Sequence, residues 1–377
     1  MRRAGALPRN TTRKRREETT MKRSSMARAA LIAVGALAAQ AHAQSNVTIY
    51  GIVDAGVEYV NHAADNGGAM RAVSGGKNTS RFGFKGTEDL GGDLKAVFNL
   101  ESGINVVNGQ FDDGPGAIFD RRATVGLSHK MWGQFTLGRT FTTTYDYMLQ
   151  FDPMGYAPNY SWATSATATG ARKDGLFSRS ANAVRYDGEF NGLKLGAMYG
   201  FGNVADSMKT SSKYDFAIGY ENGPFAVVAT YDRQNGAGNS VTPADTTDYI
   251  QGIHAGVSYR FGGAKVMAGY RNYKKTFVTA GTASLRSDMY WLGASYDFTP
   301  AFALYGAIYH QDIKDASDAD PTLISLRAQY AMSKRTALYL SGGYAFAKHG
   351  QKVSLSRDLT GAADTQVGVT AGIQHRF

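Results

Sequence analysis

The chain has 377 residues, with 45 glycines, 22 tyrosines, 19 phenylalanines and no cysteine. The lack of cysteine excludes a disulfide framework, a thiolate metal site and cysteine-based catalysis. The formal charge of +10 could suggest a nucleic-acid partner, but residues 1–43 hold ten Lys or Arg against two Asp or Glu, which leaves about +2 for the remainder. Global basicity therefore gives no support to nucleic-acid binding, and we expect no nucleic acid among the partners.

The first 43 residues have the features of a targeting region. Residues 21–43 combine a positively charged start, an apolar run over residues 29–39 and the small residues Ala41-His42-Ala43, an order typical of a secretory signal peptide. The apolar run is shorter than the ~20 residues that a membrane-spanning helix needs. Residues 1–20 add a basic run, which we interpret as an extension upstream of the true start codon, the alternative being a nucleic-acid-binding arm. We expect a single mature domain over residues 44–377.

From residue 46 onward, apolar and polar side chains alternate. In the first segment the apolar positions are Val47, Ile49, Gly51, Val53, Ala55, Val57 and Tyr59, and the polar positions are Thr48, Tyr50, Asp54 and Glu58. The same two-residue period returns in residues 94–101, 122–128, 253–261, 290–298 and 366–377. A period of two predicts β-strands with one apolar face and one wet face.

Two kinds of connection alternate between these strands. Seven are short and contain Gly, Pro, Asn, Asp or Ser, the residues of tight turns. Eight are long, at about Asn61–Asn78, Gly103–Ile118, Thr140–Ser178, Gly202–Ser212, Gln234–Asp248, Lys274–Ser287, Asp312–Asp320 and Ala347–Ala363. Sixteen strands with short turns at one end and long loops at the other predict an all-β, antiparallel transmembrane β-barrel of the outer-membrane type.

A soluble β-sandwich or propeller is the alternative architecture, but it would bury its apolar face in a core. Tyr and Phe recur here at strand ends, as aromatic girdles at two membrane interfaces would require, although both residues are also good strand formers in general. A barrel of about 16 strands is too wide for its side chains to fill and leaves an aqueous channel.

The long segment Thr140–Ser178 breaks the alternation and contains Asp146, Asp152 and two prolines. An unstructured loop of this length inside a compact protein indicates a functional insertion. We expect this third loop to fold into the channel and narrow it.

Over residues 47–377 the sequence resembles the Gram-negative general porins in their trimeric, sixteen-stranded form. The motifs that carry the resemblance are NVTIYGIVDAG, SRFGFKGTEDLGGDLKAVFNLESG, FDRRATVGLSHKMWGQFTLGRT, SRSANAVRYDG, LKLGAMYGFG and the terminal AGIQHRF. The resemblance implies a homotrimer in the outer membrane, in contact with its lipid and lipopolysaccharide. It also implies that the terminal Phe377 is the signal read by the barrel assembly machinery.

The resemblance further implies a ladder of basic residues facing the third loop. Matched motif by motif, these are Arg81, Arg139 and Arg179. Arg81 and Arg179 fall on the polar face of their strands, whereas Arg139 shares its face with Phe135 and Leu137, so its inward placement requires a break in the strand.

Opposite the arginines we expect Asp146 and Asp152 from the loop. Further charges expected in the lumen are Lys95, Glu101, Arg122 and Arg185. Rings of charged side chains determine ion preference in pores, and the excess of basic residues predicts a weak preference for anions.

The predicted function is passive diffusion of ions and small hydrophilic solutes, without a cofactor. The alternative is a substrate-specific channel or a loop-mediated adhesin, because the third loop also holds Tyr145, Tyr147, Tyr156, Tyr160 and Trp162. We expect no enzyme activity, because the histidines are scattered and the nearest candidate pair, His254 and Ser258, would lie ~13 Å apart along a strand at ~3.3 Å per residue.

Overall fold

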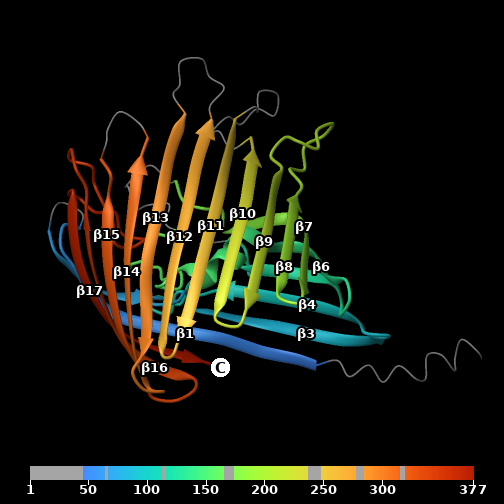
Figure 1. Ribbon diagram of the computed structural model, residues 1–377, viewed down its shortest axis with the longest axis horizontal. Coiled ribbons are helices and arrows are strands. Elements are labelled where there is room, and N and C mark those ends of the chain that lie inside the picture. The colour runs from blue at the N-terminus through green and yellow to red at the C-terminus, as the bar shows by residue number, and fades with distance from the viewer. Residues whose placement is uncertain are drawn as a thin grey trace, which may run out of the picture.

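A computed structural model describes residues 46–63, 67–112, 116–164, 174–236, 248–276, 284–314 and 319–377. The expected signal region, residues 1–43, lies outside the described residues. Seventeen strands form one closed antiparallel sheet (Figure 1). They are β1 (Asn46–Val60), β2 (Ala69–Ser74), β3 (Arg81–Gly91), β4 (Leu94–Gly103), β5 (Arg122–His129), β6 (Gly133–Phe141), β7 (Arg179–Phe190), β8 (Leu193–Gly200), β9 (Lys213–Asn222), β10 (Phe225–Asn235), β11 (Tyr249–Phe261), β12 (Ala264–Thr276), β13 (Leu285–Asp297), β14 (Phe302–Ile313), β15 (Thr322–Ala331), β16 (Thr336–Phe346) and β17 (Thr365–Arg376).

The seventeen strands occupy sixteen positions in the wall, because β2 and β3 share one. The second half of β1 pairs with β2 and its first half pairs with β3. The predicted sixteen-stranded barrel is therefore confirmed, but the prediction of a loop over Asn61–Asn78 is wrong, since Ala69–Ser74 is strand. This six-residue segment is too short to show a period, and its pairing with β1 determines its structure. Its Arg71 points inward and forms a 2.6 Å ion pair with Glu58.

The barrel closes between the first and last strands. β1 pairs with β17 from Ile52 and Arg376 to Val60 and Gly368. The terminal Phe377 extends this ladder by exchanging two backbone hydrogen bonds with Gly51, at 3.1 and 3.2 Å. Gly51 has to be small, because a Cβ atom there would lie 2.3 Å from the Phe377 ring. Closure pairs the backbone of every strand, which a sheet in lipid requires.

The barrel is apolar outside and polar inside. On β1, Val47 and Ile49 are 59% and 63% exposed, whereas Asp54 and Glu58 are 0% and 1% exposed. The predicted alternation of faces is thus confirmed, with the apolar face outward. Among the described residues, no helix has the length and apolar character needed to span a membrane.

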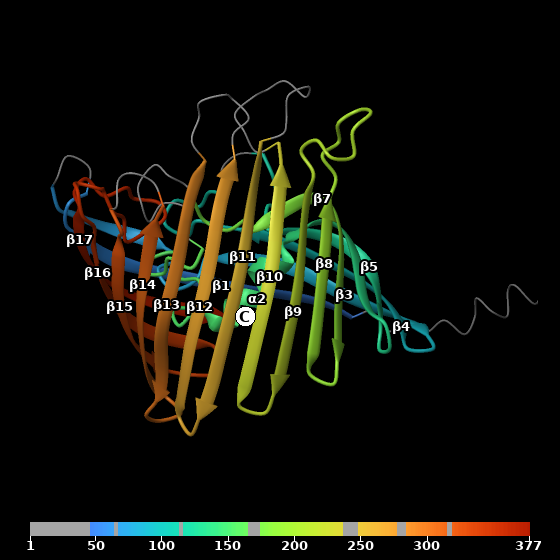
Figure 2. The same ribbon diagram turned by 45° about the horizontal axis from the view of Figure 1, so that its top comes forward.

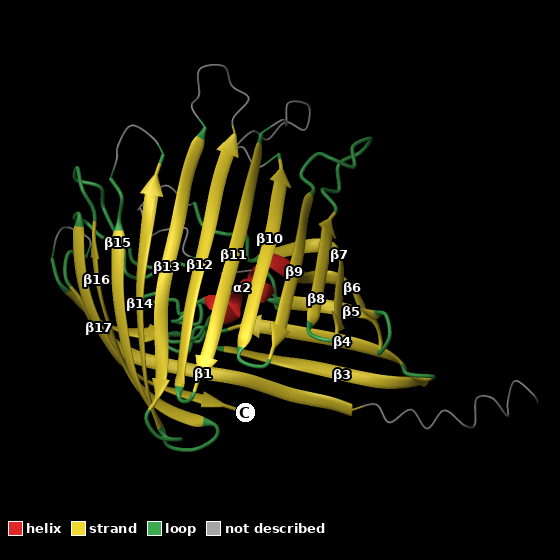
Figure 3. Ribbon diagram, in the orientation of Figure 1, coloured by secondary structure: helices red, strands yellow, loops and turns green. Residues whose placement is uncertain are grey.

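The connection between β6 and β7 lies inside the barrel. It contains the helix α2 (Thr143–Met148) and the 3₁₀ turn η2 (Leu149–Phe151), and Figures 2 and 3 show α2 enclosed by the strands. Its large apolar side chains pack against the wall formed by β10, β13, β14 and β15. The loop residues Met148, Phe151, Tyr160 and Trp162 are fully buried there. They belong to one cluster with the wall residues Val228, Met289, Trp291, Tyr309 and Leu323. The predicted inward fold of the third loop is confirmed.

Wall side chains also hold the backbone of this loop. Trp291 donates its indole N–H to the Phe151 carbonyl at 2.8 Å, and the buried Arg271 donates to the Ala163 carbonyl at 2.7 Å. Arg327, equally buried, donates to the Met154 carbonyl at 3.2 Å. The loop is therefore fixed by both apolar contacts and donors aimed at its carbonyl groups.

The last connection, residues 347–364, also enters the barrel, where we expected an external loop. Its Leu355 carbonyl accepts from the Tyr160 N–H at 3.0 Å, and its Ser354 carbonyl accepts from the Trp162 indole at 2.9 Å. Val353 is fully buried. This segment covers the third loop on the side of the long connections.

The orientation of the faces gives a stability prediction on β5. Val125 lies on the outer face between Phe98 and Leu137 of the neighbouring strands, and adjacent Thr124 points into the lumen. We expect Val125→Arg to destabilise the folded barrel by about 2–4 kcal/mol, the cost of an outward arginine at the bilayer midplane. Urea unfolding in lipid vesicles measures this difference. Thr124→Arg is the matched control and should unfold like wild type; equal losses in both variants would contradict the assignment of faces.

Candidate functional site: a charged constriction

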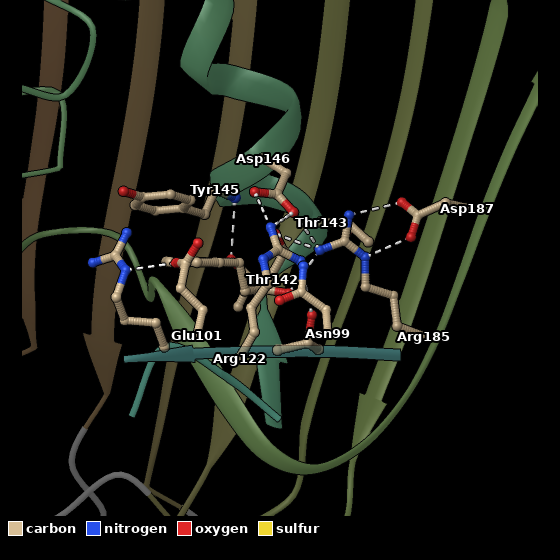
Figure 4. A network of polar contacts seen from close by, with 12 residues as sticks. Asn99, Glu101, Arg122, Thr142, Thr143, Tyr145, Asp146, Arg185 and Asp187 are labelled. Carbon is tan, nitrogen blue, oxygen red and sulfur yellow. Dashed lines mark hydrogen bonds and ion pairs between the residues drawn. The ribbon is translucent and has the colours of Figure 1, made fainter. Parts of the chain in front are cut away.

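The helix α2 carries Asp146 to the opposite wall of the barrel. The Asp146 carboxylate forms ion pairs with Arg122 of β5 at 3.0 Å and with Arg185 of β7 at 2.6 Å (Figure 4). The Thr142 hydroxyl caps the helix by accepting from the Tyr145 N–H at 3.1 Å. Two wall arginines therefore bind one loop carboxylate, and α2 lies inside the barrel next to the wall formed by β5 and β7.

A second ion pair lies beside the first. Arg121 donates to Glu101 of β4 at 2.7 Å, and the Tyr50 hydroxyl donates to the same carboxylate at 2.9 Å. Arg121 was not among the predicted site residues, because it immediately precedes β5, where the alternation of faces gives no assignment. The adjacent arginines of the FDRRAT motif were the signal available in the sequence.

An aromatic ring at the end of β6 supports the arginines. The guanidinium groups of Arg121, Arg122 and Arg179 lie 5.2, 4.7 and 5.1 Å from the centre of the Phe141 ring. Cation–π contacts contribute about 0.5–1 kcal/mol each at exposed sites and about 2 kcal/mol when desolvated, and Phe141 and Arg121 are both buried. Tyr145 of α2 stacks on the same ring at 4.6 Å. Phe141 thus holds three cations close together.

Of the three arginines in the predicted basic ladder, Arg81 and Arg179 lie at this charged cluster. Arg81 lines the same cavity as Arg121, Arg122, Glu101 and Asp146, to which Arg376 of β17 also contributes. Arg179 reaches the cluster through Phe141.

Arg139 lies at the predicted break in β6. Gly138 has a φ of 127°, and the pairing with β7 shifts register between Gly138 and Thr140. The Arg139 guanidinium donates to the backbone carbonyl of Asp120. Arg139 therefore supports the connection that leads into β5, whereas Arg122 and Arg185 are the arginines that bind Asp146.

Asp152 does not face the arginine wall, contrary to expectation. Its carboxylate is buried and accepts from the hydroxyl groups of Tyr309 and Ser161 and from the backbone N–H groups of Tyr156 and Met154. Burial raises the pKa of Asp152 despite these donors. Asp152 is thus an anchor of the third loop on β14, because the turn after η2 directs it away from Asp146.

The remaining predicted charges divide between two levels. Glu101, Arg122 and Arg185 belong to the constriction, whereas Lys95 lines a separate cavity with Lys85, near the short-turn ends of β3 and β4.

The loop aromatics are mostly unavailable to solutes, because Tyr156, Tyr160 and Trp162 are buried. Within the described ranges, no group of three or more His, Cys, Asp or Glu side chains could hold a metal ion.

The chain is similar to known outer-membrane porins. A family model described as Gram-negative porin matches residues 29–350. The outer membrane porin protein 32 of Delftia acidovorans is 34% identical over 95% of this chain and 100% of its own length. An outer membrane porin protein of Bordetella pertussis is 30% identical, with the same coverage of both chains.

Solved structures share the fold. An anion-selective porin from Comamonas acidovorans superimposes with a TM-score of 0.77 at 29% identity, over 89% of this chain and 100% of that chain. A trimer form of OmpT from Vibrio cholerae has a TM-score of 0.63 at 19% identity, over 88% and 99% of the two chains. The second likeness is one of fold alone.

The ion pairs of Asp146 give a prediction about pH. The neighbouring Arg122 and Arg185 hold the pKa of Asp146 below its ordinary value, in spite of burial. A carboxyl group with a depressed pKa stabilises the folded state above its unfolded pKa of ~3.9, and this contribution is lost as pH falls through the lower folded pKa. We therefore expect the part of single-channel conductance that depends on Asp146 to stay constant from about pH 7 to pH 4, where a carboxyl group with the ordinary pKa of ~3.9 would already be about half protonated.

The measurement is planar-bilayer conductance of the wild type and of Asp146→Asn across this range. Asp146→Asn should differ from wild type at every pH, since it lacks the charge throughout. Asp93→Asn, in the exposed turn after β3, serves as the control and should match wild type. A difference between wild type and Asp146→Asn that falls by about half on going from pH 7 to pH 4 would contradict the depressed pKa.

Proposed function

The chain belongs to the Gram-negative porin family, and from this membership we propose that its barrel is an outer-membrane pore for passive diffusion of small hydrophilic solutes and ions, with a weak preference for anions. The lumen runs past α2, so every solute crosses the charged constriction. We propose no enzymatic role for the residues that line it.

The observation that carries the anion preference is the charge of the constriction. Four arginines line its cavity, Arg81, Arg121, Arg122 and Arg376, against the two carboxylates Glu101 and Asp146. Arginine keeps its charge at any relevant pH. Closer to the short-turn ends, Lys85 and Lys95 continue the basic surface along β3 and β4. The similarity to an anion-selective porin supports the same preference.

The geometry of the constriction favours a weak preference for anions over tight binding of an anion. Both carboxylates are already engaged by arginines, at 2.6 to 3.0 Å, so the cations are partly neutralised. Low-dielectric walls focus the remaining positive field into the lumen, which raises the local concentration of anions. Conduction requires such sites to attract a solute without retaining it.

Passive diffusion is favoured over a substrate-specific channel by the third loop. A specific channel could use exposed aromatic rings as a track for solutes, but Tyr160 and Trp162 are fully buried and Tyr156 is 8% exposed. Their role in this chain is to pack the loop against the wall. We keep Tyr145 and Tyr147, which are partly exposed, as solute contacts at the constriction.

The partners follow from the same proposal. We propose that the pore is a homotrimer, that residues 21–43 are removed as a signal peptide, and that Phe377 is the feature recognised by the barrel assembly machinery. The last assignment is supported by the position of Phe377, which pairs with Gly51 at the seam of the barrel.

Charge reversal in the constriction tests the anion preference. We expect the double variant Arg81→Glu/Arg122→Glu to change the reversal potential in a salt gradient from weakly anion-selective to cation-selective, because the lining loses two cations and gains two carboxylates. An ion that passes ~4 Å from one such charge in water interacts with it by ~1 kcal/mol, which changes the partition of that ion into the constriction about fivefold. Lys334→Glu, in the exposed turn after β15, is the control and should leave the potential unchanged. Cation preference in the wild type would reject the proposal.

Passive diffusion is tested by the rate of liposome swelling. We expect rates for sugars and amino acids to fall smoothly with solute size and to rise linearly with solute concentration, because the loop rings Tyr160 and Trp162 are buried and present no track to a solute. Saturation with one solute, at a rate out of line with its size, would instead support a substrate-specific channel.

A further inference from the structure

Phe141, the last residue of β6, lies inside the barrel, although strict alternation along its strand would place it on the outer face. Phe135 and Leu137 lie an even number of positions before it and are 47% and 57% exposed, whereas Phe141 is 3% exposed. The pairing of β6 with β7 shifts register between Gly138 and Thr140, and this shift inverts the faces. The break in β6 therefore brings an aromatic ring from the lipid face into the charged constriction.

Three cations gather around this ring. The guanidinium carbons of Arg121, Arg122 and Arg179 lie 5.2, 4.7 and 5.1 Å from its centre. No two of them are therefore more than about 10 Å apart, the distance over which charges still interact at about 0.1 M salt. Like charges at this spacing repel one another, and the negative faces of an aromatic ring offset the repulsion by attracting cations. Phe141 thus favours the gathering of three arginines on one part of the wall.

The carboxylates of the constriction do not supply the same link. Glu101 of β4 binds Arg121 at 2.7 Å, and Asp146 of α2 binds Arg122 at 3.0 Å. Each carboxylate therefore draws its arginine toward a different element. The Phe141 ring contacts both of these arginines, so it holds together two cations that the ion pairs fix separately.

The ring itself is held by the wall and by the third loop. The backbone carbonyl of Phe141 accepts from the buried Arg185 at 2.8 Å, and Phe141 pairs in register with Arg179 of β7. Tyr145 of α2 stacks on the ring, with the ring centres 4.6 Å apart and the planes at 18°. A ring fixed in this way gives the arginines around it a constant position beside the lumen.

We propose that Phe141 is a positioning residue for the anion preference of the pore, which acts through Arg121, Arg122 and Arg179 without contacting the ion. The inference rests on the anion preference proposed above and adds that this preference depends on where the arginines lie as well as on how many there are. A side chain without a negative ring face would leave every charge of the lining in place but let the guanidinium groups move apart. The positive field focused into the lumen would then weaken, and the local concentration of anions would fall.

The test replaces Phe141 by leucine and, in a second variant, by pentafluorophenylalanine. The fluorine atoms withdraw electron density from the ring, so the second variant keeps an aromatic ring of similar shape but loses the attraction for cations. Each lost cation–π contact lowers the population of the clustered position of an arginine at least about twofold. From reversal potentials in a salt gradient, we expect an anion-to-cation permeability ratio at least about twofold lower in both variants than in wild type.

Two further replacements serve as controls. Phe141→Tyr retains an electron-rich ring and should keep the permeability ratio of wild type. Phe135 lies on the outer face of the same strand, where its ring packs with Trp132 and Tyr186. Leucine or pentafluorophenylalanine at position 135 should leave the ratio unchanged. Liposome swelling with neutral sugars reports the width of the lumen, and its rate should be the same in wild type and in the pentafluorophenylalanine variant of Phe141.

Two outcomes would overturn the role of Phe141. An unchanged permeability ratio in its pentafluorophenylalanine variant would show that the ring acts by its shape alone. A lower ratio accompanied by altered sugar swelling would show that the lumen had changed its width. In both cases a wild type that prefers anions leaves the pore proposal standing, whereas a wild type that prefers cations rejects both proposals.

Discussion

The pairing of β1 with β17 is the constraint on which the rest of the structure depends. A sheet in lipid must satisfy every backbone N–H and C=O group internally, and this chain does so by closing the sheet between its first and last strands. Closure fixes which faces point inward. As a result Asp54 and Glu58 are buried in the barrel while Val47 and Ile49 are exposed outside. A water-filled lumen is the consequence, since sixteen strands enclose more space than their side chains can fill.

The third loop fills part of that space and makes the lumen asymmetric. On one side its apolar residues pack on β10, β13, β14 and β15, where Arg271 and Arg327 donate to its carbonyl groups. On the other side α2 presents Asp146 to Arg122 and Arg185. Arginine therefore has two roles in this lumen. Some arginines are buried donors that position the loop, and others remain at the cavity surface, where their charge acts on solutes.

Much of the fold could be predicted from the sequence, because alternation and turn composition are local properties. They predicted the sixteen wall positions, the orientation of the faces and the inward loop. The short strand Ala69–Ser74 was missed because six residues show no reliable period, and its pairing with β1 appears only in the closed sheet.

The site was predicted less completely, for a physical reason. Alternation tells which face a side chain occupies but not which group it meets across the lumen. The resemblance assigned Arg81 to the constriction and the third loop assigned Asp146 to it, whereas Arg122 and Arg185 were expected only as further charges in the lumen. Arg121 was missed because it lies just outside a strand, and Asp152 was misplaced because its contact with Tyr309 spans 157 residues of sequence.

The contact between the third loop and the last connection joins segments that lie far apart in the sequence. Tyr160 and Trp162 are bound by Leu355 and Ser354, about 195 residues later in the chain. Contacts of such long sequence separation carry a large loop-closure cost and form late in folding. The loop is also held by β10, β13, β14 and β15, so the last connection adds a second attachment from a distant part of the sequence.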